Sequence, residues 1–175
     1  YGDGGAIFTD DDGLAAACIS LRAHGQGAGS YDIVRLGLNA RLDTLQAAVL
    51  LAKLEIFEDE IRLRRQAAQR YTERLNGVVE VPAQLPRTET IWAQYTIKLP
   101  QRDAVAAHLR ERGIPTQIYY PLPLHLQPAY RAHGGGEGSL PVAEALCQQV
   151  LALPLHPYLD EATIDIICDA VSSGL

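Results

Sequence analysis

An apolar stripe with helical spacing runs through the middle of the chain for longer than one ordinary helix. It begins near Arg41 and continues to Leu75, shortly before Gly77. Glycine commonly ends a helix because it adopts left-handed backbone angles without a Cβ clash. Globular helices usually run for about 8–20 residues. The pattern therefore predicts either two helices in succession or one helix that links two domains.

The residues before this stripe predict one strand and one helix. Residues 6–8 are apolar, and residues 6–9 are predicted to form a short buried strand. The three aspartates at 10–12 supply an N-cap and first-turn carboxylates for a helix. His24 and Gly25 then mark its end, and residues 24–30 are predicted to form a loop.

The residues after the stripe alternate between strand and helix patterns. Residues 91–99 show the period-2 alternation of a half-buried strand, and residues 78–81 and 114–120 are further strand candidates. Asp103 and Asp160 are each predicted to cap the start of a helix. A third helix is predicted to begin at Pro141 and to include Val150 on its apolar face. This alternation predicts an α/β unit with helices packed on a small sheet.

Composition excludes some functional classes. The net charge is −6, and the charges are interspersed, which argues against nucleic acid as a partner. No apolar run approaches the roughly 20 residues that cross a bilayer. The three cysteines are expected to be reduced, buried hydrophobes, and the scattered histidines show no metal-ligand spacing. Methionine is absent, even at position 1, so we expect a piece of a longer protein.

Two groups of polar residues are candidates for a binding site. Asn39 and Arg41 lie just before the long helical stripe, where an amide and a guanidinium near free backbone N–H groups would suit an anion. The alternative is that Asn39 caps the helix and Arg41 is a surface charge. Tyr120 and His125 lie in the proline-rich segment 119–130, a shaped loop that either binds a ligand or simply packs.

Four short motifs, in this order, carry a resemblance that covers essentially the whole chain. They are G-D-G-G-A at 2–6, R-x-H-G at 22–25, G-x-N-x-R-x-x-x-x-Q-A-A at 37–48 and P-x-P-L-H-x-Q-P-A-Y at 121–130. Each motif alone is weak, but together they are specific. In these motifs the chain resembles the DegT/StrS family of sugar aminotransferases.

The resemblance implies a fold-type I enzyme that uses pyridoxal 5'-phosphate. The chain would be its C-terminal half: the end of the large domain at 1–50, a linking helix at 51–77 and a small α/β domain at 78–175. Family members move an amino group, commonly from glutamate, to a keto-sugar carried on a nucleoside diphosphate. The resemblance further implies a cytoplasmic homodimer with active sites shared between its subunits.

The resemblance also assigns roles to single residues. Asn39 matches the asparagine that reaches the cofactor phosphate of the partner subunit, and Arg41 matches an arginine near the partner's substrate. Tyr120 and His125 match the loop that borders the sugar. The Schiff-base lysine of the family precedes the G-D-G-G-A motif, so it is expected upstream of Tyr1 and no catalytic residue is assigned in this chain.

Two departures and two alternatives accompany this interpretation. Tyr119 stands where relatives often have histidine, and Ile33 replaces a histidine two residues after Tyr31. Both changes concern sugar contacts and leave the cofactor chemistry untouched. One alternative is a sugar dehydratase on the same scaffold, in which histidine replaces the lysine. The other is a non-enzymatic domain that keeps the small-domain fold for association or sugar binding.

Overall fold

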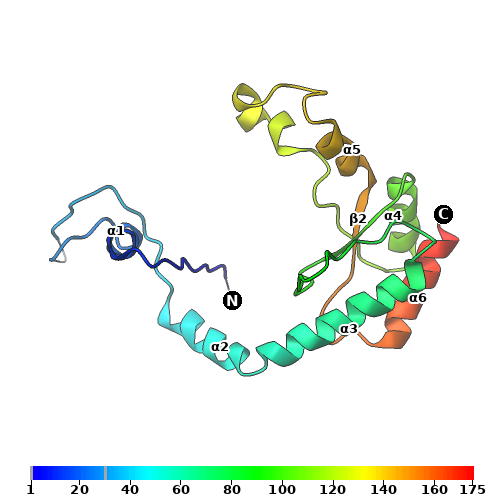
Figure 1. Ribbon diagram of the computed structural model, residues 1–175, viewed down its shortest axis with the longest axis horizontal. Helices are drawn as coiled ribbons and strands as arrows, with labels where there is room; N and C mark the ends of the chain where they lie inside the picture. Colours follow the sequence, from blue (N-terminus) through cyan, green and yellow to red (C-terminus); the bar gives the residue numbers. More distant parts are fainter. Residues whose placement is uncertain (1, 30) are drawn as a thin grey trace. The chain divides into compact units, whose positions relative to one another are not determined.

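The computed structural model describes residues 2–29 and 31–175, and these form two compact units. The first unit ends at Phe57 and the second runs from Glu58 to Leu175. Figure 1 shows the order of their elements along the chain. The three-part division at 1–50, 51–77 and 78–175 stays a prediction.

The first unit contains two helices, α1 (Asp12–Arg22) and α2 (Thr44–Leu54). The predicted cap of α1 is confirmed, because Asp11 accepts a hydrogen bond from the backbone N–H of Leu14 at 2.9 Å. The predicted strand at 6–9 is wrong. This segment has no strand pairing in the structure, and Phe8 is 93% exposed.

The long helical stripe is broken into two helices, as the first of the two alternatives predicted. After α2 ends at Leu54, α3 begins at Phe57 and runs to Leu75. The acidic residues Glu58, Asp59 and Glu60 lie in the first turn of α3. Carboxylates are favoured there by the helix dipole, so the residues that interrupt the stripe also begin the second helix. Gly77, with a φ of 83°, follows the end of α3 as predicted.

An antiparallel pair of strands lies at the centre of the second unit. β1 (Tyr95–Lys98) pairs with β2 (Val150–Leu153), with Tyr95 opposite Leu153 and Lys98 opposite Val150. The sequence interpretation placed Val150 in the preceding helix. That helix, α5 (Pro141–Gln149), ends one residue earlier.

The other predicted strands are reduced to single bridges at the edges of this pair. Glu80 bridges Lys98 on β1, and Gln117 bridges Ala152 on β2. The predicted strands at 78–81 and 114–120 are therefore wrong as regular strands. The predicted strand at 91–99 is confirmed only in its second half, because Ile91 is 52% exposed whereas Tyr95 and Ile97 are fully buried.

Three helices pack with the two strands around one apolar core. They are α3, α4 (Arg102–Glu111) and α6 (Glu161–Ser173), and Figure 1 shows α3 and α6 side by side. No described helix has the length and apolar character needed to cross a bilayer. The largest fully buried side chains are Tyr71, Leu75, Tyr95, Ile97, Leu99, Val105, Leu109, Leu151, Ile164, Cys168 and Val171.

Helix caps in the second unit follow the sequence at α6 and differ from it at α4. Asp160 caps α6 as predicted, because it accepts from the N–H of Thr163 at 2.7 Å. Asp103 was predicted to cap α4, but the cap position is Gln101, two residues earlier, and Asp103 lies inside the helix. Asp103 instead accepts from Nε of Arg102 at 2.6 Å within the first turn.

Candidate functional site

The segment that carries Asn39 is fixed by backbone pairing to the end of α1. The N–H of Leu38 donates to the carbonyl of Leu21 at 2.8 Å, and the N–H of Ala40 donates to that of Arg22 at 2.9 Å. Asn39 itself bridges Ala23 in an antiparallel pair. Asn39 is therefore held on a short ladder and not on a free loop.

Two glycines in the quoted motifs make this pairing possible. A Cβ at Gly37 would lie 2.1 Å from the backbone N of Gly25, and a Cβ at Gly25 would lie 1.8 Å from the carbonyl oxygen of Arg35. Gly25 also has a φ of 78°. Backbone approaches this close admit only glycine. From the sequence, Gly25 was expected at the end of a helix, and neither Gly25 nor Gly37 was expected to position Asn39.

The structure brings Asn39 and Arg41 into contact. Nε of Arg41 donates to Oδ1 of Asn39 at 3.3 Å, and both side chains are exposed. This bond occupies the amide oxygen and leaves the amide N–H groups of Asn39 to donate elsewhere. The alternative that Asn39 caps the helix is wrong. Asp43 precedes α2, and its backbone N–H donates to Oε1 of Gln46.

Arg41 also lines a groove of the first unit. The groove has a volume of about 990 Å³ and is bordered by residues 3–10, by α1 and by residues 40–42. Its lining is mostly apolar, and its charged members are two arginines, Arg22 and Arg41, and two aspartates, Asp3 and Asp10. An arginine beside an amide donor suits a phosphate or carboxylate, because guanidinium and amide N–H groups donate to anionic oxygens.

The proline-rich segment 119–130 starts from a fixed point on the sheet. Gln117 exchanges two backbone hydrogen bonds with Ala152 on β2, at 2.8 and 3.1 Å. Two short 3-10 helices follow, η1 (Leu124–Leu126) and η2 (Pro128–His133). The expectation of a shaped loop in this segment is confirmed.

Tyr120 and His125 occupy different settings within this loop. Tyr120 is 68% exposed, and its ring meets that of Tyr119 edge-on with centroids 5.6 Å apart. The side chain of His125 is only 8% exposed, and its Nε2 lies 3.0 Å from Oε1 of Glu144. No contact is found between Tyr120 and His125 in the described part of the chain, so the loop presents them separately.

Glu144 is the residue of this region that sequence reasoning missed. Its carboxylate accepts from His125, from the N–H of Gly138 through both oxygens (3.0 and 2.9 Å), and from the N–H of Leu140 at 3.2 Å. The hydrogen bond from Gly138, aided by those from His125 and Leu140, lowers the pKa of Glu144. One feature of the sequence could have pointed to Glu144: it is an acidic residue in the first turn of a helix, directly after a glycine-rich segment.

A cavity of about 820 Å³ lies beside the histidine–glutamate pair. It is lined by both residues and by others of the loop and of α5, among them Leu122, Arg131 and Glu137. Among residues 2–29 and 31–175, no three His, Cys, Asp or Glu side chains gather where they would hold a metal ion. The polar groups of this cavity suit a ligand rich in hydrogen-bonding groups.

Comparison with known proteins gives a single family. A model of the DegT/DnrJ/EryC1/StrS aminotransferase family matches residues 1–172. A UDP-2-acetamido-2-deoxy-3-oxo-D-glucuronate aminotransferase from Pseudomonas aeruginosa is 47% identical over 99% of this chain and 47% of its own length. The chain thus spans about half the length of the curated relatives it matches.

Solved structures agree with this match. A DegT DnrJ EryC1 StrS aminotransferase from Brucella abortus has a TM-score of 0.89 at 48% identity, over 95% of this chain and 44% of its own. DesV from S. venezuelae, solved in complex with a ketimine intermediate, has a TM-score of 0.89 at 37% identity, over 94% of this chain and 45% of its own. The fold is that of the C-terminal portion of a fold-type I transferase, as predicted.

Proposed function

Because the chain belongs to the DegT/DnrJ/EryC1/StrS aminotransferase family, whose members use pyridoxal 5'-phosphate, we propose that the protein containing it is a sugar aminotransferase. The substrate is a keto-sugar carried on a nucleoside diphosphate, and the amino donor is glutamate. The observation that carries the proposal is the match of residues 1–172 together with 47% identity to an enzyme named for amination of a UDP-linked oxo-sugar.

The residues of the first unit fit the phosphate of that cofactor. Asn39 has its amide oxygen satisfied by Arg41, so its N–H groups are left to donate to an anion. The cofactor, when bound, supplies the electron sink that lets an amino group pass between two carbonyl compounds. Asn39 would hold the phosphate group of the cofactor. Arg41 would orient Asn39 and attract the anionic substrate.

We assign the sugar end to the proline-rich loop. The exposed phenol of Tyr120 and the imidazole of His125 offer hydrogen bonds to hydroxyl groups, and prolines at 121, 123 and 128 restrict the backbone that holds them. Fixed donors and acceptors favour the reaction by holding the sugar in one orientation.

The assembly we propose is a homodimer in which Asn39 acts on the cofactor of the partner subunit. A cytoplasmic location is in line with the free, buried thiols of Cys147 and Cys168. The dehydratase and non-enzymatic alternatives are less favoured, because the Pseudomonas aeruginosa and Brucella abortus relatives, 47% and 48% identical to this chain, are both named aminotransferases.

The proposed function is tested with the whole protein, the cofactor, glutamate labelled with nitrogen-15, and UDP- or dTDP-linked keto-sugars. An aminotransferase converts the ketone to an amine that carries the label, which mass spectrometry detects. Loss of an oxygen without incorporation of label would identify a dehydratase instead. Absence of cofactor binding and of turnover would support the non-enzymatic alternative.

A further inference from the structure

Glu144 joins the histidine of the proline-rich loop to the glycine-rich segment 134–139. One of its oxygens accepts from Nε2 of His125, and both accept from the N–H of Gly138. Gly134, at the start of the same segment, lies so close to His125 that an added Cβ would be 2.9 Å from the histidine's carbonyl oxygen. The segment is therefore fitted against His125 by both a hydrogen-bonded clamp and direct packing.

The chemistry of Glu144 places a hydrogen on one nitrogen of the histidine ring. Three donors converge on its carboxylate: the N–H of Gly138, the imidazole of His125 and the N–H of Leu140. These bonds, first that from Gly138, lower the pKa of Glu144, which is therefore ionised at neutral pH. An ionised carboxylate accepts hydrogen bonds and donates none. The contact at 3.0 Å therefore requires a hydrogen on Nε2 of His125.

The other ring nitrogen remains for a ligand. The hydrogen bond between His125 and Glu144 uses Nε2 and leaves Nδ1 without a bond in the described part of the chain. Among the described residues, every buried side-chain nitrogen or oxygen has a hydrogen-bond partner. Nδ1 is therefore not a buried atom. His125 lines the 820 Å³ cavity together with Glu144. In a neutral ring that is protonated on Nε2, Nδ1 is an acceptor. It suits a ligand hydroxyl or N–H group.

We propose that Glu144 is a positioning residue, which holds His125 in the Nε2–H form and so presents Nδ1 as a hydrogen-bond acceptor to a hydroxyl group of the sugar. The inference rests on the proposed function for the identity of the ligand. The clamp itself depends only on contacts within the second unit, so the two are separable by experiment.

The first readout is the tautomer of His125 in the whole protein, measured by nitrogen-15 NMR of the imidazole groups and assigned with His125→Gln. We expect the hydrogen on Nε2 in the wild type. In Glu144→Gln the side-chain amide brings donors of its own to the site, so the preference for Nε2–H should be lost. The matched control is Glu137→Gln, which removes the same charge from the lining of the same cavity and should leave the tautomer unchanged.

The second readout is kinetic. Glu144→Gln should lower kcat/KM for the nucleotide-linked keto-sugar by about tenfold while the half-reaction with glutamate is retained. A wild-type ring protonated on Nδ1 would overturn the inference even if no variant folds. An altered tautomer with unchanged kcat/KM would also overturn the positioning role. Absence of amination in the wild-type protein, with the tautomer as expected, contradicts the sugar ligand and the proposed function but leaves the clamp established.

Discussion

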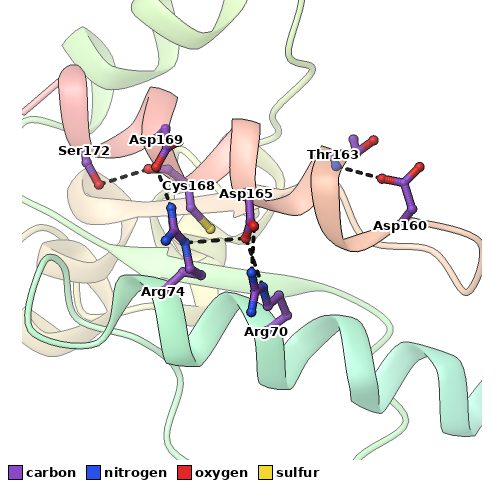
Figure 2. A network of polar contacts seen from close by, with 8 residues as sticks. All are labelled: Arg70, Arg74, Asp160, Thr163, Asp165, Cys168, Asp169 and Ser172. Atoms are coloured by element: carbon purple, nitrogen blue, oxygen red, sulfur yellow. Dashed lines mark hydrogen bonds and ion pairs between the residues drawn. The ribbon is translucent and has the colours of Figure 1, made fainter.

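Arg70 on α3 and Asp165 on α6, which are 95 residues apart in the sequence, form a two-point contact between the two helices. Nε of Arg70 donates to Oδ1 at 2.9 Å, and Nη2 donates to Oδ2 at 2.6 Å. Figure 2 shows Arg74 beside them, with its guanidinium between Asp165 and Asp169. The contact fixes the register of the two helices across the core of the second unit.

Asp165→Asn should destabilise the second unit modestly and make its stability less sensitive to acid. The hydrogen bond from Arg70 lowers the pKa of Asp165 in the folded protein. Its contribution is therefore present above the unfolded pKa of about 3.9 and is lost as the pH falls through the folded value. Urea unfolding at pH 7 and at pH 3 measures the difference between variant and wild type.

Two controls set the scale of that experiment. Asp169→Asn should have a smaller effect, because Asp169 is 73% exposed and, among the described residues, forms its ion pair with Arg74 alone. Ile97→Ala, a truncation in the fully buried core, should cost about 2–5 kcal/mol, more than either aspartate change. If Asp165→Asn and the wild type lose stability in parallel between pH 7 and pH 3, Asp165 does not have a lowered pKa.

Tyr95 should make the second unit sensitive to alkali. Its ring is fully buried and stacks on Tyr71 with centroids 5.0 Å apart, and its hydroxyl lies 2.8 Å from that of Thr72. Burial raises the pKa of Tyr95 to about 12, although the hydrogen bond with Thr72 opposes the shift. Because the pKa of Tyr95 is higher in the folded than in the unfolded protein, its contribution to stability is fully present below the unfolded pKa. This contribution is lost as the pH rises through the folded pKa.

We therefore expect the free energy of unfolding to fall between about pH 10 and pH 12, by an amount on the order of 2 kcal/mol from this residue. Tyr95→Phe should lose the hydrogen bond to Thr72 but show a shallower decline with pH. Urea unfolding at pH 9 and pH 11 compares the two proteins. Equal slopes for wild type and variant would show that Tyr95 does not titrate with a raised pKa.

Asn39 should act on the cofactor through its amide N–H groups. Asn39→Ala is expected to weaken cofactor retention by about 1–3 kcal/mol, the scale for loss of a hydrogen bond to a charged group. Asn39→Asp keeps the size and the bond from Arg41 but replaces the donor with a negative charge, so it should weaken retention further. The dissociation constant of the cofactor, followed by absorbance, measures both. Wild-type retention by Asn39→Asp would exclude contact with the phosphate.

The action of Asn39 across the dimer is tested by mixing subunits. In a heterodimer of an Asn39→Ala subunit with a subunit that lacks the upstream lysine, action in trans puts both defects in one site and leaves the other intact. Activity should then be recovered to about half that of the wild-type dimer. Heterodimers that form without recovered activity would show that Asn39 acts within its own subunit.

Local chemistry made much of the fold predictable. The caps at the starts of α1 and α6 and the proline at the start of α5 are signals carried by a few neighbouring residues, and the structure confirms all three helices. The strand β2 was missed because Val150–Leu153 is a short apolar run with no alternation. Such a run suits the end of a buried helix as well as a strand, and only pairing with β1 decides.

The features of the candidate site that were not predicted from the sequence all depend on contacts between residues far apart in the chain. Glu144 meets His125 because the chain folds back through the glycine-rich segment, and Gly37 is required because Gly25 packs against it. Neither relationship leaves a periodic or spaced pattern in the sequence. The resemblance located Asn39, Arg41, Tyr120 and His125, but the partners that orient two of these residues became visible only in the structure.

We expect this chain to supply the sugar-binding loop of an aminotransferase. Tyr120 is the most informative residue to change, because it is exposed and its ring packs on Tyr119. The two half-reactions of the whole protein are measured separately in wild type, Tyr120→Phe and the control Tyr130→Phe. Tyr120→Phe should slow transfer to the nucleotide-linked keto-sugar by about tenfold or more, equal to about 1.4 kcal/mol per decade. It should leave the half-reaction with glutamate and the melting temperature nearly unchanged, and Tyr130→Phe should match wild type. Equal loss in both half-reactions, or an unimpaired sugar half-reaction in Tyr120→Phe, would contradict the claim.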